Sequence, residues 1–237
     1  MEFPASIVQN QNPLRSMAGF QKILISFYKN TRCLLILLVS GLFAGCNRSP
    51  SLSPEKLNEA KAIFESCLVC HSTREMQRGP IIDGLPAWYT SIQLRKFQQG
   101  IRGQNPANKS ELLMGSARDR FTDEETIWLL AQYIESLPTQ PYQPVVRGNA
   151  ENGATLYQSC IPCHGKQGEG NEILKSPPLN NLEDWYLLDQ LRKFATGKRG
   201  YHPKDIEGIQ MAYTLVNLDD QDFKDLVAHI QGFSLSK

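Results

Sequence analysis

Residues 63–71 read IFESCLVCH, and residues 156–164 read LYQSCIPCH. Both stretches contain the string C-x-x-C-H, in which a histidine follows directly after a spaced cysteine pair. This string is typical of covalent attachment of a c-type haem. A zinc site or a dithiol redox pair is the alternative, but zinc needs four converging ligands and a redox pair does not need the histidine twice. The sequence therefore predicts two covalently bound haem c groups, each with its iron.

Such a motif supplies all the groups that haem attachment needs on one helical turn. Two thiols add to the vinyl groups of the porphyrin, and the imidazole ligates the iron. The predicted thioether sites are Cys67, Cys70, Cys160 and Cys163, and the predicted proximal iron ligands are His71 and His164.

A sixth iron ligand has to come from farther along the chain. Three of the five methionines are poorly placed, because they precede the mature chain or follow the first motif too closely: Met1, Met17 and Met76. A lone methionine more often fills a gap in a core. Met114 and Met211, however, stand in register with one another, and His/Met ligation raises the potential of haem in cytochromes. We therefore predict Met114 and Met211 as the sixth ligands, on a loop over the other haem face, with His202 as an alternative to Met211.

The similarity between the two halves extends well beyond the haem motifs. The motifs are offset by 93 positions, whereas the strings WY (88–89) and LRKF (94–97) recur 97 positions later. Five further residues repeat at that second offset: Gly100, Arg102, Gly103, Pro106 and Met114. The chain is therefore predicted to contain two copies of one module.

The pattern of caps and apolar residues predicts that each module is helical. Ser53 followed by Pro54 is typical of a helix start, and apolar residues then recur at helical spacing. A capping box from Thr122 to Glu125 predicts a helix that stops near Pro138. Its counterpart is expected to begin at Asp219 or Asp220 and to run through residue 230. A third helix in each copy carries LRKF and ends at a glycine, at position 100 or 197.

Three prolines in residues 138–144, PTQPYQP, predict a short extended linker between the modules. The expected fold class is all-α, with two tandem domains joined by this Pro-rich linker. The predicted boundaries are a signal peptide at 1–46, domain 1 at 47–138, the linker at 139–147 and domain 2 at 148–237.

Residues 17–46 have the layout of a secretory signal, with three basic residues before an uncharged run at 33–44. The run ends in LFAGC (42–46), which resembles a bacterial lipobox and predicts lipidation of Cys46. An ordinary cleaved signal and a retained membrane anchor are the alternatives. Cys33 lies in the discarded segment and has no assigned role. We expect the mature protein on the periplasmic side of a bacterial membrane, lipid-anchored through Cys46.

Charge is evenly balanced. Lys and Arg number 25 and Asp and Glu 24, so no basic field indicates a nucleic-acid partner. Residues 47–138 contain 11 basic and 11 acidic side chains, whereas residues 148–237 contain 9 basic and 12 acidic ones. Because negative charge stabilises ferric iron, net charge predicts a lower potential for the second haem.

Both modules resemble class I cytochrome c domains, and the tandem resembles the di-haem cytochrome c4 family over about residues 55–232. That resemblance implies crossed N- and C-terminal helices in each domain and electron delivery to terminal oxidases. It also implies that Pro80 and Pro177 offer their carbonyls to the proximal histidines. The second copy has the family's glycine-rich run at 165–170, whereas the first has Ser72-Thr73-Arg74. The G-x-R-G strings also resemble cytochrome domains attached to oxidase complexes.

The expected function is electron transfer in a bacterial respiratory chain, without enzymatic activity or a small-molecule substrate. The donor would be a quinol-oxidising complex or a dehydrogenase, and the acceptor a terminal oxidase. A permanent cytochrome subunit of an oxidase or dehydrogenase complex is one alternative, and a di-haem peroxidase is another. Four arginines are expected either near haem carboxylates or in solvent: Arg95, Arg102, Arg192 and Arg199. Trp88, Trp185 and His229 are expected to be packing residues.

Overall fold

The computed structural model describes residues 52–73 and 77–235, apart from the side chains of residues 234 and 235. These residues form helices without strands, and one isolated bridge pairs Asn171 with Ser176. The predicted all-α class is therefore confirmed. The predicted signal segment with Cys33 and Cys46, and also Met76, lie outside the described residues.

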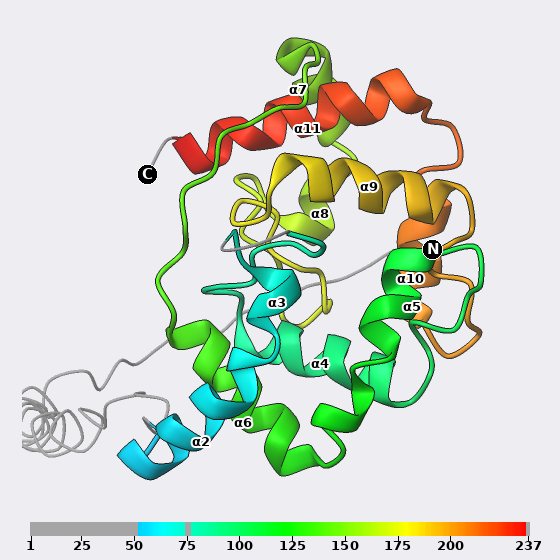
Figure 1. The fold of residues 1–237 in the computed structure, drawn as a ribbon. Helices are drawn as coiled ribbons and strands as arrows, with labels where there is room; N and C mark the ends of the chain where they lie inside the picture. The colour runs from blue at the N-terminus through cyan, green and yellow to red at the C-terminus, as the bar shows by residue number, and fades with distance from the viewer. Residues whose placement is uncertain (1–51, 74–76, 236–237) are drawn as a thin grey trace, which may run out of the picture. The chain divides into compact units, whose positions relative to one another are not determined.

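The described residues of the first half, 52–73 and 77–137, contain five α-helices and a short 3-10 helix (Figure 1). They are α2 (Pro54–Glu65), α3 (Leu68–His71), α4 (Ala87–Gln98), α5 (Lys109–Gly115), η1 (Arg118–Arg120) and α6 (Glu124–Ser136). The second half repeats the order with α7 (Ala150–Tyr157), α8 (Ile161–His164), α9 (Asp184–Ala195), α10 (Ile206–Thr214) and α11 (Asp220–Leu235).

The starts of the helices follow local capping. The Ser53 hydroxyl accepts a hydrogen bond from Lys56 N, and Pro54 takes the first helical position, as predicted. The predicted capping box at Thr122 is wrong by one residue. Asp123 is the N-cap of α6, because its backbone is extended and its carboxylate accepts Thr126 N at 2.8 Å.

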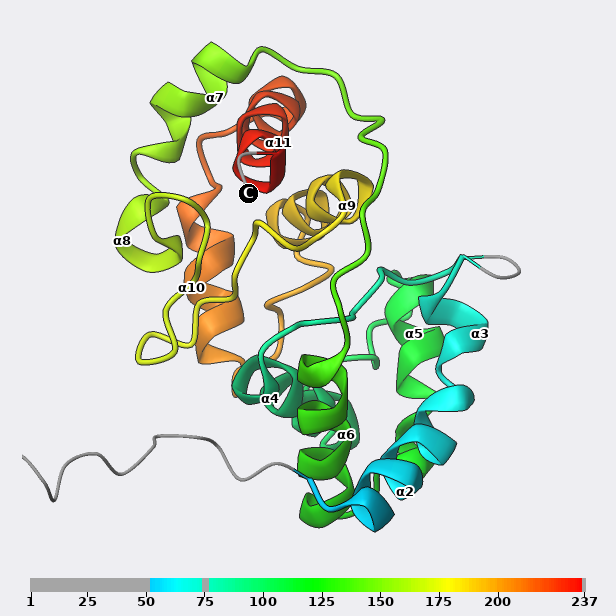
Figure 2. The ribbon, with the colours of Figure 1, turned by 90° about the vertical axis from the view of Figure 1, so that its left-hand side faces the viewer.

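In each half the first and last helices pack together, and the LRKF helix packs on the last one. The pairs are α2 with α6 and α4 with α6 in the first half, and α7 with α11 and α9 with α11 in the second (Figure 2). The α7–α11 crossing is especially close. A Cβ on Gly153 would lie 1.9 Å from the Asp225 carbonyl oxygen, whereas the first half has buried Ala60 at the corresponding position.

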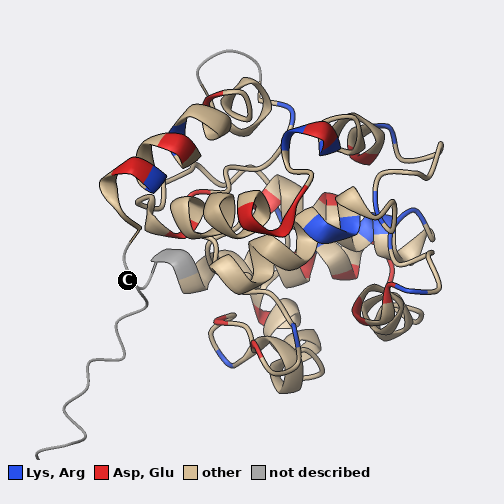
Figure 3. Ribbon diagram, turned by 90° about the horizontal axis from the view of Figure 1, so that it is seen from below, with Lys and Arg blue, Asp and Glu red and all other residues tan. Residues whose placement is uncertain are grey.

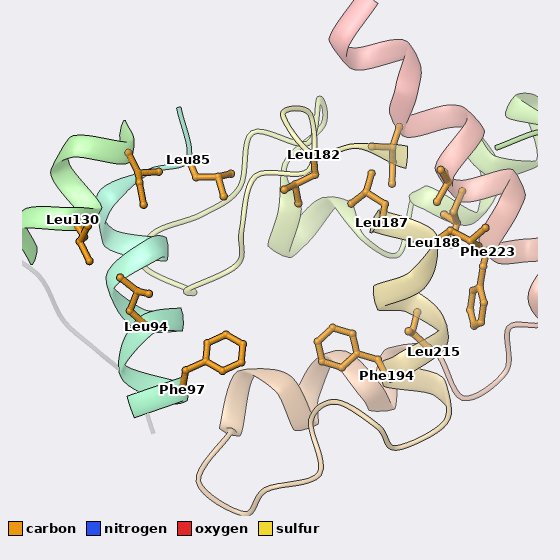
Figure 4. Close-up of a cluster of buried hydrophobic side chains, with 14 of the residues drawn as sticks. Leu85, Leu94, Phe97, Leu130, Leu182, Leu187, Leu188, Phe194, Leu215 and Phe223 are labelled. Carbon is orange, nitrogen blue, oxygen red and sulfur yellow. The ribbon is translucent and has the colours of Figure 1, made fainter. Parts of the chain in front are cut away.

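One cluster of buried hydrophobic side chains runs through both halves. Figure 4 shows leucines from α4, α6 and α9 in this cluster, with the rings of Phe97 and Phe194 pointing toward each other from α4 and α9. Phe97 and Phe194 are equivalent residues of the two copies. Side chains of α4 and α9 also line one cavity, so the two equivalent helices border the same interior space.

Residues 138–149 form no helix and are attached to the second half by partly buried hydrogen bonds. The Asp184 carboxylate, at the start of α9, accepts Val145 N and Val146 N, both at 2.6 Å. It also accepts Gln231 Nε2 from α11 at 3.2 Å. The end of the connecting segment is thereby held against α9 and α11.

Polar contacts between the halves follow the same internal symmetry. Lys96 Nζ on α4 reaches the carboxylates of Asp205 at 2.6 Å and Glu207 at 2.9 Å. Lys193 on α9, the equivalent of Lys96, donates to Ser110 Oγ at 2.7 Å, and Ser110 is the equivalent of Glu207. Lys96 therefore forms ion pairs across the two halves, whereas its equivalent Lys193 forms only a hydrogen bond to a hydroxyl across them.

This ion pair makes stability depend on pH. Burial alone would raise the pKa of Glu207, but hydrogen bonds from Lys96 and Lys175 lower it to about 2 from an ordinary value of 4.5. A lowered folded-state pKa contributes stability above pH 4.5, and this contribution is lost as pH falls toward 2. We therefore expect Glu207→Gln to lower the Tm at pH 7 and to have a smaller effect at pH 3.

The measurement is thermal unfolding of the full holoprotein at both pH values, with Glu151→Gln as the control. Glu151 is exposed, so its substitution removes the same charge at the surface. An unchanged Tm difference between the wild type and Glu207→Gln at pH 3 would contradict the ionic role of Glu207.

Acidic and basic residues are interspersed over most helices in the view of Figure 3. Within residues 52–73 and 77–235, no helix has the length and apolar character needed to cross a membrane.

Candidate haem sites

The two C-x-x-C-H motifs fold as single helical turns, α3 and α8. His71 N donates to Cys67 O at 3.0 Å, and His164 N donates to Cys160 O at 2.9 Å. Each turn therefore carries two cysteines and a histidine on a short, hydrogen-bonded segment. Burial raises the pKa of the Cys67 and Cys160 thiols.

A proline carbonyl orients each histidine ring. His71 Nδ1 lies 2.7 Å from Pro80 O, and His164 Nδ1 lies 3.0 Å from Pro177 O. Because a carbonyl oxygen only accepts, Nδ1 must carry the proton, and Nε2 keeps its lone pair. Burial also lowers the pKa of both histidines, which favours the neutral ring. Each imidazole is thus prepared to bind a metal through Nε2.

Gly79 supports the ring of His71. A Cβ at position 79 would lie 2.7 Å from Cε1 and 2.9 Å from Nδ1 of that ring. Any side chain there would displace the imidazole, so the contact between the glycine and the ring helps to fix the direction of Nε2.

A cavity of about 370 Å³ brings the predicted residues of the first half together. Cys67, Cys70, His71 and Met114 all line it. Its volume lies within the range of small-molecule and cofactor sites, and most of its wall is apolar. Side chains of α9 complete the wall from the second half, among them Trp185, Tyr186 and Gln190.

The structure places the two methionines on helices rather than on the expected loop. Met114 belongs to α5, where Asn108 Oδ1 accepts Glu111 N, and Met211 belongs to α10, where Asp205 Oδ1 accepts Gly208 N. These N-caps stabilise the first turn of both helices. Met211 is half-buried and packs against the same hydrophobic cluster as Cys160.

One side of the cavity is polar. Arg102 and Glu111 line it and form a buried ion pair in which both Nε and Nη2 donate to Glu111 Oε1. Arg102 Nη1 also donates to Gln93 Oε1 at 2.6 Å, and the guanidinium lies 4.6 Å from the centre of the Phe97 ring. Arg102 is therefore buried, so its predicted solvated environment is wrong, and its observed partners are Glu111 and Gln93.

The second half has an equivalent arginine. Arg199 is 8% exposed, donates to Gln190 Oε1 at 2.6 Å and lies 4.5 Å from the centre of the Phe194 ring. The other two arginines face outward, because Arg95 pairs with Glu124 and Arg192 pairs with Asp220 in partly exposed contacts.

Unpartnered polar atoms show that one side of the cavity could receive polar groups of a ligand. Thr90 Oγ1 and Glu111 Oε2 line the cavity and have no hydrogen-bond partner among the described residues. Buried polar atoms normally have partners. A ligand with an apolar ring and polar substituents would fill the apolar part of this space and reach its polar side.

The remaining candidates have ordinary surroundings, with one exception. His202 Nδ1 accepts Lys204 N at 3.1 Å, and the His229 ring packs against Tyr157 and Phe233. Trp185 is the exception, since it lines the first cavity from the other half.

Sequence reasoning missed Gln93, Glu111 and Gln190. A signal was present for the glutamines, which stand at the 97-residue offset of the repeat. Glu111 breaks that repeat, because Gly208 stands at the equivalent position.

The described residues are all-α and contain two C-x-x-C-H turns, and the histidine of each turn contacts a proline carbonyl. This is the architecture of a di-haem c-type cytochrome. The family model for cytochrome c matches residues 57–138 and 150–234. The chain therefore belongs to the cytochrome c family, and its two tandem domains each carry one covalently bound haem c.

The curated relatives include a cytochrome c4, an electron acceptor and an oxidase subunit. Cytochrome c4 of Azotobacter vinelandii is 25% identical over 181 residues, which cover 70% of this chain and 83% of that protein. The thiosulfate dehydrogenase electron acceptor of Stutzerimonas stutzeri is 27% identical, and the match covers 60% of this chain and 69% of that protein. The cbb3-type cytochrome c oxidase subunit FixP of a Bradyrhizobium strain is 23% identical, and the match covers 70% of this chain and 60% of that protein.

Solved structures agree in fold. Cytochrome c4 from Pseudomonas stutzeri superposes with a TM-score of 0.56 at 20% identity, covering 74% of this chain and 97% of that one. Thiosulfate dehydrogenase from Marichromatium purpuratum superposes with a TM-score of 0.58 at 23% identity, covering 73% of this chain and 39% of that one. The chain thus spans well under half of the second structure.

Proposed function

We propose that His71 with Met114, and His164 with Met211, are the axial ligands of the two haem irons. Cys67 and Cys70, and Cys160 and Cys163, form the thioether links. The Nδ1–H bonds to Pro80 and Pro177, which leave Nε2 free, support the proximal roles. The shared cavity of Cys67, Cys70, His71 and Met114 supports the first set. Each haem supplies one-electron exchange between ferric and ferrous iron.

The function we propose is electron transfer between a quinol-oxidising complex or dehydrogenase and a terminal oxidase, on the periplasmic side of a bacterial membrane. The observation that carries this proposal is the contact of Nδ1 of each histidine with a proline carbonyl, which leaves Nε2 available to iron. With the proposed methionines as sixth ligands, neither iron would have a position for a substrate. The cysteines would hold the porphyrin ring, and the proline carbonyls fix the imidazole of each histidine. The apolar wall of the cavity would exclude water from the first haem.

Purification from native membranes tests the choice between a mobile carrier and a permanent subunit. A mobile carrier should elute without partners after mild detergent extraction. Stoichiometric recovery of oxidase or dehydrogenase subunits at raised salt would instead establish the permanent subunit.

A thiosulfate dehydrogenase is a specific candidate donor. Besides the Stutzerimonas relative, a thiosulfate dehydrogenase electron acceptor of Thiomonas intermedia is 54% identical over a segment of 41 residues. Stopped-flow reduction of the purified protein by such a dehydrogenase and thiosulfate should be fast. No reduction beyond the rate without enzyme would exclude this donor.

Peroxidase activity should be negligible in the intact protein, because peroxide must bind iron directly and both sixth positions are filled. It should appear after Met114→Ala or Met211→Ala opens a position. Steady-state turnover with a peroxidase dye measures this. Wild-type turnover comparable to that of dedicated peroxidases would contradict the assignment of an electron carrier.

Membrane attachment should depend on Cys46, which we propose is lipidated. Each buried methylene contributes about 0.8 kcal/mol, so several acyl chains anchor a protein stably. Cell fractionation of Cys46→Ala, with Cys33→Ala as the control, should show loss of the processed membrane form for the first variant alone. Release of the wild type by a mild salt wash would refute lipidation.

A further inference from the structure

One peptide group connects the histidine of the first haem motif to a carboxylate of the second half. This is the peptide between Pro80 and Ile81. Its carbonyl oxygen lies 2.7 Å from His71 Nδ1, and its N–H donates to Glu183 Oε2 at 2.8 Å. Because a peptide group is planar and rigid, a carboxylate that holds its N–H also fixes the direction of its carbonyl. The carboxylate and the imidazole are thus bonded to opposite ends of one rigid unit.

The Glu183 side chain is directed at the first half and not at its own helix. Glu183 is the N-cap residue of α9, yet its carboxylate does not cap that helix. Gln77 Nε2 instead lies 2.9 Å from Oε1 and 2.7 Å from Oε2 of this carboxylate. Glu183 is only 7% exposed, and a buried carboxylate requires hydrogen-bond donors. These contacts therefore hold residues 77–81 against the start of α9.

The second half cannot form the same connection. At the 97-residue offset of the repeat, Ile81 corresponds to Pro178, which has no N–H to donate. The position of the carboxylate corresponds to Pro86, which has no acceptor in its side chain. The loop after the second haem motif is closed within itself, because the backbones of Asn171 and Ser176 exchange hydrogen bonds of 2.8 and 2.9 Å. The peptide that holds the second histidine therefore has no carboxylate behind it.

We infer that Glu183 is a positioning residue for the iron ligand His71, acting through the peptide between Pro80 and Ile81. This inference rests on the proposed ligation of the first iron by His71. A carboxylate bonded to the N–H of a peptide polarises that peptide and makes its carbonyl oxygen a stronger acceptor. A stronger bond to Nδ1–H fixes the ring and makes Nε2 a better donor to iron. The second half thus supports the histidine of the first.

Exchange of the Nδ1–H proton with solvent tests the inference. The rates at His71 and His164 are measured by NMR in the reduced, full-length holoprotein. His164 is the internal reference, because the peptide that holds it has no N–H. Exchange requires that the hydrogen bond to the proline carbonyl opens, so the rate reports how firmly each ring is held.

We expect Glu183→Ala to speed exchange at His71 by about tenfold or more, the effect of losing a hydrogen bond to a charged group. The rate at His164 should stay unchanged. Ile81→Pro, which copies the second half and keeps the carboxylate, should have the same selective effect. Glu183→Gln, which keeps an oxygen for the amide but removes the charge, should give a smaller increase. Glu207→Gln is the control, because it removes another carboxylate that pairs across the halves and should change neither rate.

Equal acceleration at both histidines in Glu183→Ala would show a general loosening of the protein and would overturn the inference. An unchanged rate at His71 would do the same. If Glu183→Ala does not fold, Glu183→Gln and Ile81→Pro decide by the same criterion.

The absorbance spectrum reports iron ligation separately. A wild-type spectrum without the weak red band of a ferric iron–methionine bond would contradict the proposed ligand sets. The comparison of exchange rates would still decide whether Glu183 holds the His71 ring. A retained band with an unchanged rate at His71 in Glu183→Ala would refute the inference while the proposed ligands stand.

Discussion

Replacement of Met114 or Met211 by alanine should remove half of the weak red absorbance band that marks a ferric iron–methionine bond. It should also lower the reduction potential of one of the two haems. The thioether of methionine stabilises ferrous iron, and water in its place favours ferric iron. Axial ligands set haem potentials over about 0.8 V, so we expect a fall on the order of 0.1 V or more. Spectroscopic redox titration of the full-length protein measures both effects.

Leu112→Ala is the matched control for the first site. Leu112 lies on α5 two residues before Met114, is 37% exposed and does not line the cavity, so its truncation should leave the band and the potentials in place. Retention of the full band in Met114→Ala or Met211→Ala would show that another side chain, such as His202 in the second half, ligates the iron.

Gly153→Ala should destabilise the second half strongly, although alanine is the better helix former. An added Cβ would meet the Asp225 carbonyl oxygen at 1.9 Å and the carbonyl carbon at 2.5 Å. Both atoms belong to the α11 backbone, so relief requires that the helices move apart. We expect a loss of about 3 kcal/mol or more, at the upper end for overpacked sites.

Gly232→Ala on α11 is the matched control for Gly153→Ala, because it makes the same substitution at a helical glycine with free space around it. No atom lies within 4 Å of a Cβ added there, so helix propensity alone acts and should stabilise by about 0.5–1 kcal/mol. Denaturant unfolding of both holoprotein variants measures the difference. Equal free energies of unfolding for the two variants would contradict the close approach of α7 and α11.

The sequence was sufficient to predict the haem-attachment turns and the principal helices, since these depend on local signals. A proline at the first helical position fixed the start of α2, and glycines at positive φ ended α4 and α9, at Gly100 (69°) and Gly197 (65°). The start of α6 was off by one because Thr122 and Asp123 are both good caps. Only the three-dimensional structure shows which side chain reaches the amide.

The short helices that carry the methionines were missed for a different reason. With seven and nine residues, α5 and α10 are too short for a clear apolar period, and their stability depends on packing. Their caps, Asn108 and Asp205, were visible in the sequence but are equally common in turns. The buried pairing of Arg102 with Glu111 was beyond sequence reasoning, because a charged residue on a helix usually faces solvent.

The contribution of α9 to the first cavity has a consequence for biogenesis. The chain is made from its N-terminus, so the first C-x-x-C-H turn exists about a hundred residues before Trp185 and Tyr186. Until the second half has folded, the first site lacks that wall and is open to attachment chemistry from that side. The later half then closes over the earlier one. A folding defect confined to the second half would leave the first haem exposed to water, even though every residue that binds it is intact.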